Sequence, residues 1–307
     1  MKKIFIGIVS ILLFSSCLSE SNEWVITSPD GNIQMSVFNL KSDNGQNANL
    51  TYNVNYKDKE VVLNSPLGID REDEQFSENL KFVSKGESTR IDEKYTLKSG
   101  KKLECHNLAN EQIFTFANEN GKHVQLIIRA YNDGIAFRYK FPEEDSKTYK
   151  VINEQTGFKF STDGKAWIHP YHWNNRKKPS YEDYCENEIQ IGTDSPKEQG
   201  WAYPMLFNAN GIWTMVTEAT MDGTYCATHV RSTKDGLYKV HFAEKDEVAI
   251  PDNPEPVSVL PWATPWRVIA VSDGLGGIVE TNIVQNLNPS SLITDESWIN
   301  PGRSSWS

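Results

Sequence analysis

Most of the chain alternates apolar and polar residues in short runs that end at turn signals. The stretch LTYNVNY, residues 50–56, places Leu, Tyr, Val and Tyr at every second position, and a turn is expected at residues 57–60. A period of two puts alternate side chains on opposite faces of a β-strand. The pattern therefore predicts strands over most of residues 24–270.

Three further segments predict β-hairpins. Strand patterns flank the letters NDG at 132–134 and NG at 210–211, and another follows DG at 235–236. Asn-Gly and Asp-Gly favour tight hairpin turns because both residue types tolerate a positive φ. Sequential hairpins of this kind are typical of antiparallel sheets.

One segment, residues 272–287, predicts a helix. Its apolar side chains Leu275, Ile278, Val279 and Ile283 lie on one helical face. Ser272 or Asp273 is available as the N-cap. The predicted fold class is thus all-β, a large antiparallel β-sandwich with few short helices.

Charge and aromatic content restrict the ligand class. The formal net charge is −10 over 307 residues, which argues against nucleic-acid binding because phosphates need clustered Lys and Arg. Aromatic residues make up 11% of the chain. They fit either stacking on sugar rings or an aromatic β core, since aromatics favour strands.

The first residues, MKKIFIGIVSILLFSSC, predict an export signal. Lys2 and Lys3 precede an apolar stretch that is too short to span a bilayer, and small serines precede Cys17. This arrangement resembles a bacterial lipoprotein signal in which Cys17 is lipidated; ordinary secretion with cleavage nearby is the alternative. The lipoprotein reading predicts an exported protein that is lipid-anchored to a bacterial membrane, periplasmic or at the cell surface.

The remaining cysteines are Cys105, Cys185 and Cys226. Three thiols form at most one disulfide, so the chain is no disulfide scaffold. Their wide spacing also matches no zinc ribbon or finger.

Two polar clusters are candidate metal sites. The stretch SYEDYCENE carries Glu182, Asp183, Glu186 and Glu188, which could bind Ca²⁺ or form a solvated acidic loop. The stretch IHPYHW carries His169 and His172, which could bind zinc with Cys185 or Glu182. Histidines satisfied by backbone carbonyls are the alternative, because a spacing of three on an extended chain points side chains to opposite faces.

Two further features are candidates for sugar-directed chemistry. Glu218 and Asp222 could form a carboxylate pair for glycoside hydrolysis, or Glu218 could be a solvated strand end. Trp262, Trp266 and Arg267 could form a sugar platform, or the tryptophans could seal the sandwich while the arginine pairs with an interior carboxylate. No nucleotide-binding glycine motif and no Gly-x-Ser-x-Gly elbow is present.

An ordered set of segments resembles the N-terminal domain of glycoside hydrolase family 97, a family of α-glucosidases and α-galactosidases. These segments are TSPDGNIQMSVF, YKDKEVVLNSPLGI, YNDGIAFRYKFP, AWIHPYHWN followed by YEDY, TEATMDGTYC, TPWRVIAVSDGLGGIVETNIVQNLN and WINPGRSSW. Together they cover roughly residues 25–307. The resemblance implies a β-supersandwich of the galactose-mutarotase-like type, followed in the family by a (β/α)₈ barrel that carries the catalytic carboxylates.

The resemblance also implies a metal and a partner. In calcium-dependent members the N-terminal domain lends one glutamate to a Ca²⁺ site beside the scissile sugar, and the match places it at Glu182, with Glu186 as the fallback. The implied function is the N-terminal, carbohydrate-binding part of a calcium-dependent exo-acting α-glycosidase. Its implied partners are an oligosaccharide with α-linked glucose or galactose and the barrel of the same parent chain, which leaves this chain alone inactive. The alternative is a free-standing sugar-binding surface lipoprotein.

The expected organisation has four parts. Residues 1–16 form the signal peptide, 17–23 a tether, 24–290 the sandwich, and 291–307 a connector that leads into the first barrel strand. Trp306 would then be a barrel core residue separated from its neighbours.

Overall fold

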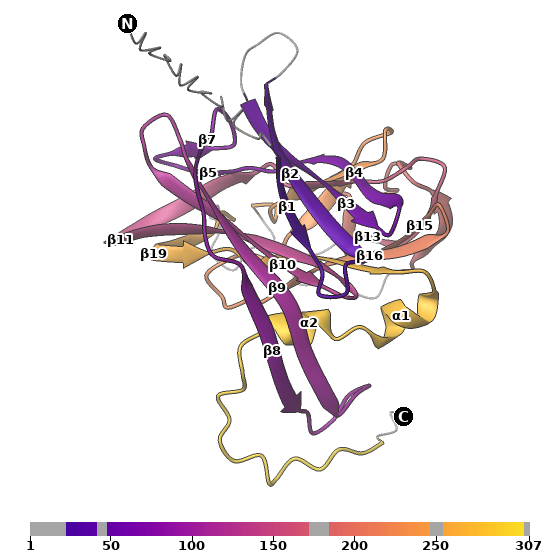
Figure 1. Cartoon of the computed structure of the whole chain (residues 1–307). Helices are drawn as coiled ribbons and strands as arrows, with labels where there is room; N and C mark the ends of the chain where they lie inside the picture. Colours follow the sequence, from indigo (N-terminus) through magenta and orange to yellow (C-terminus); the bar gives the residue numbers. More distant parts are fainter. Residues whose placement is uncertain (1–22, 42–47, 172–183, 246–253, 304–307) are drawn as a thin grey trace, which may run out of the picture.

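The computed structural model describes residues 23–41, 48–171, 184–245 and 254–303, and in these residues it is almost entirely antiparallel β-sheet (Figure 1). The all-β prediction is confirmed. The N-terminal half contains β1 (Glu23–Thr27), β2 (Ile33–Lys41), β3 (Ala48–Tyr56), β4 (Lys59–Pro66), β5 (Ile69–Arg71), β6 (Gln75–Phe76), β7 (Lys81–Lys85), β8 (Thr89–Thr96), β9 (Glu104–Ala117), β10 (His123–Tyr131) and β11 (Gly134–Glu154).

The C-terminal half continues the sheet and adds two short helices. It contains β12 (Gly157–Lys159), β13 (Lys165–Pro170), β14 (Glu186–Gln190), β15 (Trp201–Ala209), β16 (Ile212–Ala219), β17 (His229–Ser232), β18 (Leu237–His241), β19 (Val257–Ala263), β20 (Trp266–Ser272), α1 (Leu275–Glu280) and α2 (Ile283–Leu287).

Two groups of strands pack on each other. One has the order β1-β2-β3-β4, and the pairing continues through β12 to β18 and β17. The other has the order β8-β9-β10-β11-β20-β16-β15-β13-β14. The long strand β11 also pairs with β19 and β5 along its second half.

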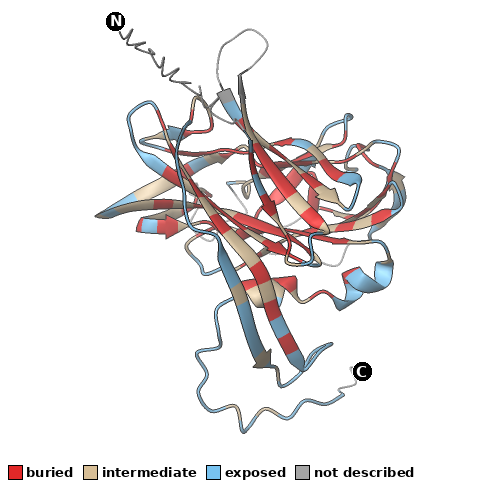
Figure 2. Ribbon diagram, viewed as in Figure 1, coloured by how far each residue is buried: buried red, intermediate tan, exposed pale blue. Residues whose placement is uncertain are grey.

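The main core fills the space between the two groups. Tyr52 on β3 meets Phe137 on β11 edge to face with ring centroids 5.2 Å apart, and both rings are buried. The Tyr52 hydroxyl donates to the Gly157 carbonyl oxygen at 2.9 Å, so its polar end is satisfied inside the core. Figure 2 shows the buried residues along the crossing strands, with β8 and the C-terminal segment largely exposed.

The predicted hairpins are confirmed. Tyr131 pairs with Gly134 across the first turn, and Ala209 pairs with Ile212 across the second. Asn210 and Gly211 have φ of 55° and 75°, as a tight hairpin turn requires at both central positions. Local turn chemistry thus sets the register of these strands.

The predicted single helix is wrong in its length and its cap. The segment forms α1 and α2, which lie on the outer face of β20 and β16 over a second apolar cluster (Figure 1). The break lies at Thr281, whose hydroxyl donates to Asp133 Oδ2 at 2.6 Å. The N-cap is Gly274, and Val279 is 63% exposed rather than buried. A contact with a distant turn therefore overrides the helical pattern.

The predicted connector, residues 291–307, is described as far as residue 303. Residues 288–303 are mostly exposed and contain no helix or strand. Trp306 and the rest of residues 304–307 lie outside the described residues, so the predicted start of a barrel strand stays a prediction. No helix in the part of the chain that the structure describes is long and apolar enough to cross a membrane.

Candidate functional site

The predicted calcium ligand and its fallback lie at or beside a gap in the described residues. Glu182 lies outside them, as do His172 and Cys17. Glu186 begins β14, an edge strand, and pairs with Ile168 of β13; its side chain is half-buried. Glu188 on the same strand is exposed, so the described part of the acidic cluster is strand rather than loop.

The other predicted residues separate in space or pair elsewhere. His169 is half-buried on β13 and pairs with Ala202 of β15. Cys185 is exposed, and Cys105, Cys185 and Cys226 are all free thiols. The described residues therefore show no zinc group built on His169 and Cys185.

A buried ion-pair network lies in the core around Arg267. Arg267 on β20 donates from Nε and Nη2 to the two carboxylate oxygens of Glu154, at 2.8 and 2.5 Å. Its Nη1 donates to Glu218, its cross-strand neighbour on β16. The side chains of Arg267 and Glu154 are fully buried, and that of Glu218 is 9% exposed.

Hydroxyl groups complete the network. Tyr225 donates to Glu154 Oε2 at 2.8 Å, and Thr228 donates from its hydroxyl and its backbone N–H to Glu218 at 2.6 and 3.2 Å. Burial lowers the pKa of Arg267, but the two carboxylates outweigh it and hold the pKa well above its usual value. Burial raises the pKa of Glu218, and Arg267 opposes that shift.

This network explains the TPWR stretch. Trp262 and Trp266 are 4% and 1% exposed, so neither presents a free face to a sugar. Trp266 instead lies under the guanidinium groups of Arg138 and Arg129, at 4.3 and 4.9 Å from its ring centroid. The structure therefore favours sealing tryptophans and an arginine paired with interior carboxylates.

The proposed Glu218–Asp222 carboxylate pair is not formed. Asp222 accepts hydrogen bonds from the backbone and hydroxyl of Thr224 in an exposed loop, whereas Glu218 is bound to Arg267. The expectation of a solvated Glu218 is also wrong, because its partner guanidinium lies inside the core. Glu154 and Glu218 instead bind one shared cation, Arg267.

Sequence reasoning missed a histidine pair beside this network. His229 and His241 are direct partners across the β17–β18 hairpin. The sequence did contain a signal for this pair. In a hairpin whose turn is centred on Asp235, residues at equal distances before and after the turn pair with each other, and His229 and His241 are such residues. Burial lowers the pKa of His229 to about 3, with smaller contributions from His241 and Arg231, so the ring is neutral at pH 7.

A surface cavity opens between the network and the histidine pair. It has a volume of about 320 Å³, and its lining includes Glu154, His241 and Glu244. The described part of the chain thus places a buried Arg–carboxylate network and a polar hollow at the same end of β11 and β18.

Comparison with known proteins decides the family. The model of the family described as Glycosyl-hydrolase 97 N-terminal matches residues 26–289. The chain belongs to this family. The match covers nearly all of the described sandwich, from β1 to the residues after α2. The family assignment from the ordered sequence segments is therefore confirmed.

Two curated relatives carry an activity in their names. The chain is 28% identical over 257 residues to a probable retaining alpha-galactosidase of Streptomyces bingchenggensis, which covers 84% of this chain and 37% of the relative. It is 25% identical over 337 residues to a retaining alpha-galactosidase of Bacteroides thetaiotaomicron, which covers 100% of this chain and 47% of the relative. The glycosyl-hydrolase 97 chain thus spans less than half the length of these relatives.

Solved structures share the fold. A crystal structure of a beta-arabinopyranosidase superposes with a TM-score of 0.76 at 31% identity, covering 85% of this chain and 42% of that protein. A glycoside hydrolase family 97 enzyme from Pseudoalteromonas sp. strain K8, solved in complex with acarbose, has a TM-score of 0.76 at 22% identity and covers 91% and 40%. The sandwich is thus the shared part of larger glycosidases.

Proposed function

We propose that this chain is the N-terminal domain of an exo-acting retaining α-galactosidase, and that the catalytic carboxylates lie in a barrel of the same parent protein. The observation that carries the proposal is the family match over residues 26–289, supported by two relatives named as retaining alpha-galactosidases. A retaining mechanism needs two carboxyl groups about 5 Å apart across the glycosidic bond.

The substrate class follows from the names of the relatives. Galactose and L-arabinopyranose have the same ring configuration, and the arabinose lacks only the C6 carbon. The chain is 31% identical to a beta-arabinopyranosidase and 28% identical to a probable alpha-galactosidase. We therefore favour a galacto-configured pyranoside at the end of an α-linked oligosaccharide over a glucoside.

The described carboxylates support a non-catalytic role for the sandwich. A general acid needs a carboxyl group that reaches the leaving oxygen, and a nucleophile needs one that reaches the anomeric carbon. Glu154 and Glu218 are held by Arg267 inside the core. These two residues stabilise the fold that the barrel would pack against.

The family resemblance is the reason for proposing a Ca²⁺ site. Ca²⁺ takes about six to eight oxygen ligands. Among the described residues the sandwich forms no cluster of three carboxylates, and Glu186 at the β14 edge offers one. The sandwich would therefore contribute one ligand to a shared Ca²⁺ site. Glu182 is the proposed ligand and Glu186 is the fallback. The other ligands would come from the barrel.

Bound Ca²⁺ would act as a Lewis acid and template for the substrate. The glutamate that holds it would stay ionised, so it would position the ion rather than donate a proton. This assigns to the sandwich the task of completing the active site.

The test uses the proposed parent protein, in which a barrel follows this chain. Glu182→Gln should weaken Ca²⁺ binding and lower hydrolysis of nitrophenyl α-galactoside, whereas Glu188→Gln on the exposed side of β14 should change neither. Unchanged calcium dependence in both Glu182→Gln and Glu186→Gln would remove the ligand assignment. A stop codon directly after codon 307 would instead favour the free-standing sugar-binding lipoprotein.

We propose that the protein is exported and anchored to a bacterial membrane only through the lipid on Cys17, in the periplasm or at the cell surface. Cys17→Ser should shift the protein from the membrane fraction to the soluble exported fraction, because the acyl chains are lost. Retention in the membrane fraction would contradict lipidation at Cys17.

A further inference from the structure

Two imidazole rings face each other across one end of a rigid hairpin. His229 begins β17 and His241 ends β18, and the two are direct partners in the antiparallel ladder. Their ring centroids lie 5.2 Å apart with planes inclined by 31°. Backbone pairing fixes this separation, because directly opposed residues project from the same face of the sheet.

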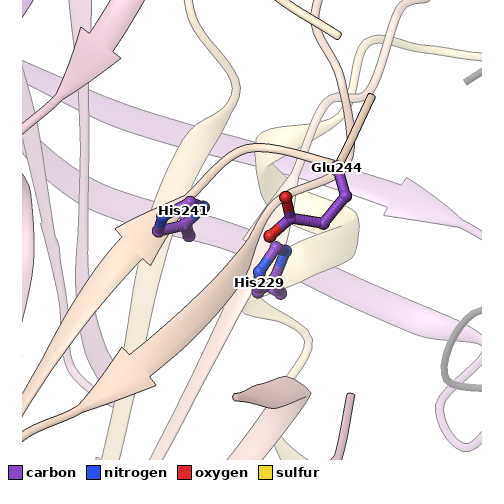
Figure 3. Close-up of side chains that lie close together, drawn as sticks. All are labelled: His229, His241 and Glu244. Atoms are coloured by element: carbon purple, nitrogen blue, oxygen red, sulfur yellow. The ribbon is translucent and has the colours of Figure 1, made fainter. Parts of the chain in front are cut away.

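A carboxylate joins the two rings. Glu244 lies three residues after His241, and one ligand atom from each of His229, His241 and Glu244 lies within 4.8 Å of the other two. Figure 3 shows the Glu244 carboxylate directed toward the His229 ring, with the His241 ring beside it. In the part of the chain that the structure describes, this is the one such group of three metal-ligating side chains.

His229 is buried, and no described residue forms a hydrogen bond with its ring. Its exposure is 0%, and within the described part of the chain neither Nδ1 nor Nε2 has a partner. Tyr171 covers one face of the ring, stacked at 4.2 Å between centroids with an interplanar angle of 14°. Buried polar groups in folded proteins are nearly always satisfied, so an imidazole held in this way calls for a ligand.

The second histidine is oriented for ligation. The Nδ1 of His241 lies 3.2 Å from the Phe242 carbonyl oxygen, which can only accept, so Nδ1–H is the donor. This hydrogen bond leaves the Nε2 lone pair available, in the manner of metal-ligating histidines whose other nitrogen is held by a carbonyl. The Glu244 carboxylate also accepts from Arg231 Nη2 at 2.5 Å.

We propose that His229, His241 and Glu244 form a Zn²⁺ site with two nitrogen ligands and one carboxylate oxygen, leaving a fourth position for water. Two imidazoles and a carboxylate suit zinc, whereas Ca²⁺ prefers an all-oxygen shell. Zinc bonds of about 2.0–2.1 Å place tetrahedral ligand atoms about 3.3 Å apart. His241 and Glu244 are half-buried and can close the remaining gap by rotating their side chains.

The cavity beside the cluster gives the ion a route from solvent. His241 and Glu244 both line it, so a hydrated ion can reach them before it reaches His229. Once bound, zinc would join the β17–β18 hairpin to the segment that follows β18. The site would therefore raise the stability of this end of the sandwich.

The first test is zinc titration of the chain, purified without a polyhistidine tag and stripped with a chelator. Calorimetry at pH 7.5 should show one Zn²⁺ bound per chain. His241→Gln and Glu244→Gln should each weaken binding at least tenfold, because each removes a ligand. His123→Gln, at an exposed position at the start of β10, is the matched control and should leave zinc affinity unchanged.

The second test is spectroscopic. Co²⁺ in place of zinc should give the visible absorption of a low-coordinate site in the wild type, absent in His241→Gln and undisturbed by excess Ca²⁺. Circular dichroism of each variant verifies that the fold is kept. Absence of stoichiometric zinc binding, equal binding in the two ligand variants and the control, or displacement by Ca²⁺ would overturn the proposal.

Discussion

Arg267 shows how a single buried cation can organise one end of a β-sandwich. Its guanidinium group binds two carboxylates that come from β11 and β16, and all three side chains are nearly or fully inaccessible. Taking charges out of water is costly, and the network is stable only while each charge keeps its partner. The arginine therefore links strands that are distant in the sequence.

Removing the Arg267 cation should strongly destabilise the fold. Arg267→Met leaves Glu154 and Glu218 buried without a counter-charge, and we expect a loss of about 3–5 kcal/mol in the free energy of unfolding. Urea unfolding followed by tryptophan fluorescence measures it. Lys57→Gln, at an exposed pair with Asp273, should leave the unfolding midpoint unchanged.

Glu218→Gln should cost clearly less than Arg267→Met. Glu154 keeps its two hydrogen bonds to Arg267 in this variant, and burial already raises the pKa of Glu218, which disfavours its charge. The same urea experiment compares the two variants. Equal losses would show that the two carboxylates contribute alike and would contradict this view of the network.

The reactivity of the thiols tests the burial of individual residues. Burial raises the pKa of the Cys226 thiol to about 12, so about one molecule in ten thousand carries the thiolate at pH 8. Cys185 is exposed. Iodoacetamide followed by peptide mass spectrometry should label Cys185 readily and Cys226 only after unfolding; rapid labelling of Cys226 in the folded chain would contradict the burial.

At the scale of elements, turns help to set the register of the strands. Glycine is required at two positions, Gly211 and Gly200, for different reasons. Gly211 has a positive φ of 75°, and an added Cβ would meet nothing within 4 Å. Gly200 has φ of 101°, and an added Cβ would lie 2.1 Å from the Val230 carbonyl oxygen on β17. The first position tolerates a side chain sterically, and the second does not.

Gly211→Ala should therefore cost about 1 kcal/mol, which is the backbone strain of a left-handed residue. Gly200→Ala should cost several times more, because β17 must also move away from the residue that precedes β15. Thermal or urea unfolding of both variants tests the ranking. A Gly200→Ala variant as stable as Gly211→Ala would show that this contact between the strands is not tight.

The comparison of elements also shows what the sequence could predict. The hairpins at Asn132–Gly134 and Asn210–Gly211 were predictable because the turn residues and the alternation are local. The split between α1 and α2 was not, because it depends on Thr281 reaching Asp133 in a distant turn. For Arg267, the sequence offered pairing with an interior carboxylate as one of two alternatives. It could not identify Glu154 as the partner, since 113 positions separate the two residues.

At the scale of the molecule, the sandwich is the shared part of larger enzymes. The match spans residues 26–289, and the chain covers 37% and 47% of two curated relatives. Sequence segments in the right order sufficed for the family, which the match over residues 26–289 confirms. The proposed substrate class rests on the names of these relatives.

The most direct test of the central claim is an activity assay on the purified chain. Incubated with nitrophenyl α-galactoside, with and without Ca²⁺, the chain alone should release no more nitrophenol than a blank without protein. The proposed parent protein, in which a barrel follows this chain, should release it readily. Turnover by residues 17–307 above the blank would contradict the account, because it would place the catalytic groups inside the sandwich.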